Sequence, residues 1–315
     1  MDLYRQARDV PRTASTSFVA ATYRDLRSEL TAGQIRWRRE RGRIAHPHHG
    51  VYLSGQGQPE FLDRVRAALL AAPPSAMLGS HTAARLYGFG VSRDDTIHLM
   101  VPAGTPFPQR RGITAHQVVV PVGDPVEVLG LPCAPPARCA VDLARCLRRT
   151  DALPVLDAAL HCEACELADL LREVMRHSGL RGVRQARELI PLADPRAECR
   201  QESQLRLLLH DAGIRGLVPQ LPVLNDFGVP LYRLDLGDPE RRLGIEYDGE
   251  SHLDRRRLQA DRARHNWLQG SGWAMHYFTA YDLYVRPEAI VDAVASARRS
   301  RANRRDQRST SNLSP

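Results

Sequence analysis

The stretch Tyr232–His252, YRLDLGDPERRLGIEYDGESH, alternates aliphatic and acidic residues on both sides of a short polar loop. If Pro239–Arg242 form the loop of a β-hairpin, Asp235 lies opposite Glu246 on the neighbouring strand. Because successive side chains of a strand point to opposite faces, this register gathers these acids and Asp248 on one face. The other face would be aliphatic and would carry Leu234, Leu236, Leu243, Ile245 and Tyr247.

Carboxylates that face one another across two strands repel, so a hairpin of this kind favours a compensating cation. Hard oxygen ligands suit Mg²⁺ or Mn²⁺, whose coordination shell is completed by water and phosphate oxygens. The pattern therefore predicts a divalent metal site on Asp235 and Glu246, or else a hairpin whose polar face simply meets water.

Around the hairpin, residues 196–296 are expected to form a mixed sheet flanked by helices. An amphipathic helix pattern, AECRQESQLRLLLHDAG, comes before the strands and ends at Gly213. The charged pattern LDRRRLQADRARHNWLQGSG and the strand pattern WAMHYFT follow the hairpin, and the helix pattern PEAIVDAVASARR closes the segment. This order of elements indicates an α/β (α+β) domain.

The same segment resembles the very-short-patch-repair-like branch of the PD-(D/E)XK nuclease superfamily. The resemblance rests on Glu202 in ESQLRLLL, Asp235 in YRLDL, and IEYDGESH followed by DRARHNWLQGSGWAMHYF. It implies a restriction-endonuclease-like fold and Mg²⁺- or Mn²⁺-dependent hydrolysis of DNA phosphodiester bonds, in phage defence or DNA repair.

The resemblance also implies a role for each matching residue. Asp235 and Glu246 would hold the metal ion, with the main-chain carbonyl of Tyr247 as a further ligand. Either His252 or Asp248 would orient or deprotonate the attacking water.

Two further residues match the pattern outside the hairpin. Glu202 corresponds to an accessory acid on the first helix. Arg264 would face the DNA phosphates, with a structural salt bridge as the alternative.

One residue of the superfamily motif is absent. The chain has 44 basic residues and no lysine, so all of them are arginine. Asp248 stands where the superfamily has its lysine, although an acid or a histidine is expected there in this branch. Two hypotheses remain open: a metal-dependent endonuclease, or a non-catalytic regulator with a degenerate nuclease fold.

A cluster of arginines lies near the N-terminus, in Arg36–Arg43, RWRRERGR. It falls within a helix, helix, hairpin pattern in residues 1–56, with Thr31 as the expected N-cap and HPHHG as the expected turn. This order is typical of a winged helix-turn-helix domain, whose second helix enters the major groove of DNA. The residues expected to contact DNA are Arg36, Arg38, Arg39, Arg41 and Arg43, the alternative being an ordinary basic helix face.

The part of the chain before residue 190 resembles AbiEi-type antitoxins of abortive-infection systems. The resemblance rests on LTAGQIRWRRERGRIAHPHHGVYL and on SHTAARLYG. It implies DNA binding, transcriptional control and a cognate toxin protein as partner. Residues 57–195 are expected to form a mixed α+β middle domain, in which we find no catalytic constellation.

The length of 315 residues allows two or three domains. No run approaches the ~18 apolar residues that a membrane span requires, and the N-terminus lacks a secretory signal pattern. We therefore expect a cytoplasmic protein with no membrane partner. Residues 297–315 are expected to be a disordered basic tail, because RRSRANRRDQR at 298–308 holds six arginines and one aspartate.

Overall fold

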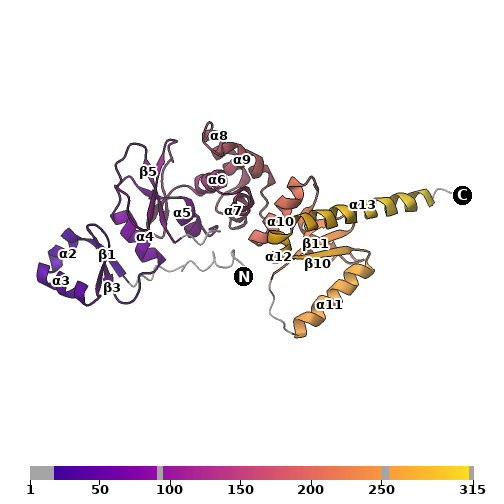
Figure 1. Cartoon of the computed structure of the whole chain (residues 1–315), viewed down its shortest axis with the longest axis horizontal. Helices are drawn as coiled ribbons and strands as arrows, with labels where there is room; N and C mark the ends of the chain where they lie inside the picture. The colour runs from indigo at the N-terminus through magenta and orange to yellow at the C-terminus, as the bar shows by residue number, and fades with distance from the viewer. Residues whose placement is uncertain (1–17, 91–94, 250–254, 312–315) are drawn as a thin grey trace.

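The computed structural model describes residues 18–90, 95–249 and 255–311, without the side chains of 255–260 and 303–311. The described elements fall into three groups that follow one another along the long axis of the molecule (Figure 1). Each group has one sheet and its own helices, which agrees with the expected mixture of α and β structure.

The N-terminal group has two short helices and a three-stranded antiparallel sheet of order β1-β3-β2. Its elements are β1 (Phe18–Thr22), α2 (Tyr23–Glu29), α3 (Ala32–Glu40), β2 (Ile44–His48) and β3 (Val51–Gly55).

Local sequence explains where α3 begins. Thr31 is its N-cap, and the Thr31 and Gln34 side chains exchange hydrogen bonds with each other's backbone amides. Ile35 is the one buried residue of α3 and packs with Leu26 of α2, so a single apolar side chain anchors this helix. The hairpin turn is shorter than expected, because β2 continues to His48.

The middle group contains a five-stranded sheet of order β6-β5-β4-β8-β7 and a set of helices. The strands are β4 (Met77–Leu78), β5 (Ile97–Pro102), β6 (Ile113–Val118), β7 (Val126–Val128) and β8 (Leu131–Cys133). The helices are α4 (Phe61–Leu70), α5 (Ser80–Tyr87), α6 (Pro136–Cys146), α7 (Arg149–His161), α8 (Leu167–Arg176), α9 (Val183–Leu189) and the 3₁₀ turn η1 (Ile190–Leu192).

The C-terminal group contains a four-stranded sheet of order β12-β11-β10-β9. Its strands are β9 (Val218–Leu224), β10 (Pro230–Asp238), β11 (Leu243–Asp248) and β12 (Ala274–Thr279). Its helices are α10 (Arg200–Asp211), α11 (Arg255–Gly270), α12 (Ala280–Val285) and α13 (Pro287–Ser311). The sheet lies between α11 on one side and α10, α12 and α13 on the other (Figure 1).

Two helices are shared between neighbouring groups. In α4, Ala67 packs with the N-terminal sheet, whereas Val65 belongs to the core of the middle group. In α10, Leu207 packs in the middle core while Leu205 and Leu209 pack in the C-terminal core. The groups are therefore joined by the packed helices α4 and α10.

Helix α13 runs through the arginine-rich stretch that was expected to be a disordered tail. It extends to Ser311, so that expectation is wrong for residues 297–311. No helix in the described part of the chain is long and apolar enough to cross a membrane.

Candidate functional site

The β10–β11 hairpin has the register that the acidic pattern predicts. Leu236 pairs with Ile245 and Asp238 pairs with Leu243, in antiparallel orientation. The regular pairing stops at Leu236 and Ile245, so Asp235 and Glu246 come directly after its last pair.

Beyond this pair the two-face pattern breaks down. The carboxylate of Asp235 accepts a hydrogen bond of 2.9 Å from the backbone N–H of Tyr247. Leu234 packs with Leu268 of α11, on the opposite side of the sheet from the cluster that holds Leu236. The expectation that Leu234 shares one aliphatic face with Leu236 is therefore wrong.

The adjacent edge strand contains a related irregularity. Gln220 of β9, which would lie opposite Asp235, has a φ of +49°, a left-handed conformation that is uncommon outside glycine. Its side chain donates a hydrogen bond of 2.8 Å to Glu202 of α10. The backbone N–H of Glu198 donates to the same carboxylate oxygen, at 3.0 Å.

Arg264 of α11 pairs with Glu246. The Nη1 atom lies 3.2 Å from Oε2 of Glu246, and Nη2 bonds to Oε1. Nη2 also donates to the main-chain carbonyl of Arg233, at 2.7 Å. Arg264 thus forms the salt bridge that the sequence left as an alternative to a phosphate contact.

Burial is the main influence on the pKa values of these three acids. It raises the pKa of Glu246 to about 7, against the opposing effect of Arg264 and with a further contribution from Asp235. Burial and the charge of Asp235 likewise raise the pKa of Glu202 to about 7. Burial also raises the pKa of Asp235, although the amide of Tyr247 opposes this shift. Perturbed carboxylates that influence one another are characteristic of functional sites.

The other predicted site residues make fewer contacts with the carboxylates of Glu202, Asp235 and Glu246. Asp248 ends β11 and is exposed, but its charge still contributes to the raised pKa of Glu246. His252 lies outside the described residues. Tyr247 is half-buried and packs against the core beneath the sheet.

Three residues near the acids were not anticipated from the sequence. Gln220 holds Glu202, and Tyr277 of β12 pairs with Glu246 in the parallel β11–β12 register. The hydroxyl of Tyr277 lies 3.3 Å from Nδ1 of His265 on α11. Of these three, only Tyr277 could have been placed from the sequence, because it belongs to the strand pattern WAMHYFT that follows the acids.

These carboxylates could hold a divalent cation only if water supplied most of its other ligands. In the described part of the chain, no three His, Cys, Asp or Glu side chains are grouped to hold a metal ion. Mg²⁺ commonly takes one or two carboxylates and keeps several waters, a requirement that Asp235 and Glu246 can meet. Glu246 would first have to exchange its contact with Arg264.

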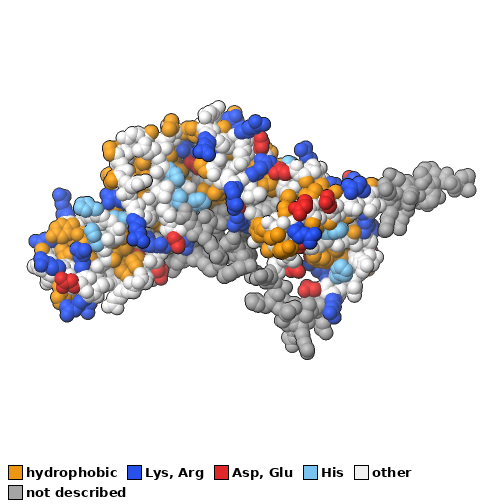
Figure 2. All heavy atoms as spheres, in the orientation of Figure 1, with side chains coloured by type: hydrophobic (Ala, Val, Ile, Leu, Met, Phe, Trp, Pro, Cys, Tyr) orange, Lys and Arg blue, Asp and Glu red, His pale blue; other side chains and the backbone are white. Residues whose placement is uncertain are grey.

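The five N-terminal arginines form a second candidate site. Arg36, Arg38, Arg39, Arg41 and Arg43 are all exposed. None of them forms an ion pair with an acid within the described residues. The guanidinium carbons of Arg41 and Arg43 lie 4.1 Å and 5.4 Å from the ring centre of Trp37. Figure 2 shows basic side chains gathered at the end of the molecule where α3 lies.

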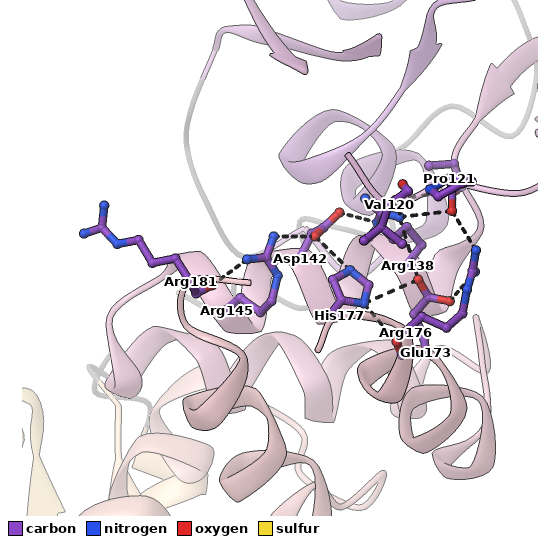
Figure 3. A network of polar contacts seen from close by, with 11 residues as sticks. Val120, Pro121, Arg138, Asp142, Arg145, Glu173, Arg176, His177 and Arg181 are labelled. Atoms are coloured by element: carbon purple, nitrogen blue, oxygen red, sulfur yellow. Dashed lines mark hydrogen bonds and ion pairs between the residues drawn. The ribbon is translucent and has the colours of Figure 1, made fainter. Parts of the chain in front are cut away.

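The middle group contains a buried polar network that sequence reasoning missed (Figure 3). Asp142 of α6 accepts hydrogen bonds from Arg138 at 2.6 Å, from Arg145 at 2.8 Å and from His177 at 3.2 Å. Burial would raise the pKa of Asp142, but these bonds outweigh it and hold the pKa well below its usual range. Arg138 also donates to the carbonyls of Val120 and Pro121, so the network ties α6 to a loop.

Most of the middle group is similar to a known family of proteins. Residues 75–192 match the family described as AbiEi antitoxin C-terminal domain, which agrees with the resemblance seen in the sequence. The matched segment runs from just before β4 to the end of η1 and includes the network around Asp142.

Two mycobacterial proteins are similar over most of the chain. They are the uncharacterized protein MT2308 of Mycobacterium tuberculosis strain CDC 1551 / Oshkosh and the uncharacterized protein Rv2248 of strain ATCC 25618 / H37Rv. Each is 32% identical over 268 residues, which covers 84% of this chain and 96% of the relative. The chain belongs to the same family as these two proteins.

Proposed function

We propose that the chain is a DNA-binding regulator of the AbiEi antitoxin kind. The observation that carries this proposal is the set of five exposed arginines on and after α3, without acidic partners among the described residues. The order α2, α3, β2, β3 corresponds to a winged helix-turn-helix, in which α3 enters the major groove and the hairpin touches phosphates. The AbiEi-like segment at 75–192 supports transcriptional control and a cognate toxin as partner.

The test compares duplex DNA binding by two variants that lose the same charge. In one, Arg36, Arg38 and Arg39 are changed to alanine. In the matched control, three exposed arginines of the middle group, Arg172, Arg184 and Arg187, are changed instead. We expect the α3 variant to lose affinity in a gel-shift titration and the control to bind nearly as wild type. Equal losses in both variants would show that α3 is not the contact surface.

A second candidate function is metal-dependent hydrolysis of DNA phosphodiester bonds. The observation that favours it is a group of three interacting carboxylates. Glu202 and Glu246 are buried, Asp235 is half-buried, and the charge of Asp235 acts on both of the others. Their elements follow the order of the restriction-endonuclease-like pattern in the sequence: helix, then two strands of a hairpin.

Asp235, Glu246 and the carbonyl of Tyr247 would hold Mg²⁺ or Mn²⁺, which when bound would polarise the scissile phosphate and acidify a water. Asp248 is exposed at the end of β11 and would orient the attacking water, a role that the sequence also assigns to His252. Glu202, buried beside Asp235, would set the charge of the site.

Cleavage of plasmid and oligonucleotide DNA with Mg²⁺ or Mn²⁺ tests this candidate. We expect Glu246→Gln and Asp248→Ala each to abolish metal-dependent cleavage while the proteins remain folded. If the wild-type protein cleaves no DNA with either metal, the regulatory function stands alone.

A further inference from the structure

Arg264 has contacts that a simple phosphate-binding arginine would not need. Its guanidinium engages both carboxylate oxygens of Glu246 from β11 and the carbonyl of Arg233 from β10. It also lies 5.8 Å from the ring centre of Tyr232. The cation is thus fixed between α11 and two strands, at the carboxylate that the metal site would use.

We propose that Arg264 is a latch that competes with the divalent cation for Glu246 and that a DNA phosphate releases it. This inference rests on the second candidate function. A metal ion bound to the Glu246 oxygens would lie beside the guanidinium, and the two positive charges would repel across a poorly solvated space. The latched site would therefore bind metal weakly.

The latch can open without unfolding the domain. Only 10% of the Glu246 side chain is exposed, but 28% of the Arg264 side chain is, so the guanidinium has a route to solvent. Arginine binds phosphate through the same two-pronged geometry that it uses for carboxylate. A phosphodiester that approached the exposed part of Arg264 would draw it away from Glu246, and metal and DNA would then bind with positive coupling.

Arg264 and Arg262 provide a matched pair for the test. Both belong to α11, but Arg262 is exposed and forms no ion pair within the described residues. The full chain is prepared as wild type, Arg264→Gln and Arg262→Gln, and Mn²⁺ binding is measured by calorimetry at about pH 8, where proton competition for the carboxylates is limited.

We expect Arg264→Gln to bind Mn²⁺ about fivefold or more tighter than wild type, and Arg262→Gln to bind as wild type. In chelator, Arg264→Gln should melt below wild type, and saturating Mn²⁺ should narrow that difference. If Arg264→Gln is poorly folded, Arg264→Lys replaces the two-pronged contact by a single one and should give an intermediate gain in affinity.

Two negative outcomes are distinguishable. Equal Mn²⁺ affinity in all variants would make Arg264 a structural partner of Glu246 and overturn the latch, while the metal site would stand. Absence of Mn²⁺ binding in every variant would overturn the latch together with the metal-dependent function.

Discussion

Glu202 is the residue whose titration most directly reports the state of the acidic site. The residue is 9% exposed, and its carboxylate accepts hydrogen bonds from Gln220 and from the amide of Glu198. Its pKa is about 7 in the folded chain, against an ordinary value of 4.5. A raised carboxyl pKa means that the folded state binds the proton more tightly than the unfolded chain does.

The sign of the pH effect follows from this difference. The stability associated with protonated Glu202 is fully present below about pH 4.5 and is lost as pH rises through about 7. Glu202→Gln keeps the shape without the charge, so above pH 7 it should be more stable than wild type by about 1–3 kcal/mol. Urea unfolding between pH 5 and pH 8.5 measures this. Parallel pH profiles for mutant and wild type would show that Glu202 is not forced to ionise in a buried site.

Asp142 of the middle group is the opposite case to Glu202, because its hydrogen bonds lower its pKa in the folded chain. It neutralises Arg138, whose side chain is 3% exposed, and it also accepts from Arg145 and His177. Asp142→Ala would leave Arg138 buried without its main anionic partner, a loss of about 3–5 kcal/mol in unfolding free energy. The control Arg172→Ala breaks an exposed pair with Asp169 and should cost at most about 1 kcal/mol. Similar losses in thermal unfolding would contradict a structural role for the network.

At the scale of secondary structure, the cap of α3 can be tested separately from its charge. Thr31→Ala removes the side-chain bond to the amide of Gln34 and should destabilise the N-terminal group by about 1 kcal/mol. No cation is lost, so DNA affinity should fall slightly while its salt dependence stays unchanged. A changed salt dependence would mean that Thr31 acts through DNA contacts and not through the helix end.

Elements with strong local signals were predictable, and those that depend on distant partners were not. The α3 cap follows from Thr31 and Gln34, and the β10–β11 register follows from alternation around a polar loop. The break at Asp235 was unpredictable because it coincides with the left-handed Gln220 on another strand and with a hydrogen bond from an amide on β11. The charged pattern at 298–308 suggested disorder, but Arg298 pairs with Asp238 of β10 and Arg301 donates to the carbonyl of Gly272, contacts that no local pattern reveals.

The candidate site shows the same limit. Asp235 and Glu246 were found from spacing, and Glu202 and Arg264 from the family resemblance. The contact of Arg264 with Glu246 depends on how α11 lies on the sheet, which no local pattern determines.

At the scale of the whole molecule, α10 links the AbiEi-like segment to the acidic site. Asp157 of α7 is fully buried and pairs with Arg206 of α10, while Glu202 lies one turn earlier on the same helix. Gln204 reaches both sides, since it donates to the carbonyl of Thr150 and accepts from the hydroxyl of Tyr284. The two groups should therefore unfold as one unit.

Asp157→Ala tests this linkage. It leaves Arg206 largely buried without its partner, which should cost about 3–5 kcal/mol. Hydrogen exchange should rise in α7 and also in β10, although β10 belongs to the other group. The exposed pair Arg149–Asp211 spans the same junction, and Arg149→Ala should change exchange little. Faster exchange confined to α7 would show that the groups open independently.

The central claim is that α3 binds DNA through arginines that have no acidic partner among the described residues. Each phosphate contact contributes about 0.9 to the slope of log K against log salt. Fluorescence anisotropy with a labelled duplex over a range of salt concentrations measures this slope. Changing Arg36, Arg38 and Arg39 to alanine should reduce its magnitude by about 2.7, whereas changing Arg172, Arg184 and Arg187 should leave it as in wild type. An unchanged slope in the α3 variant, or an equal reduction in both, would contradict the account.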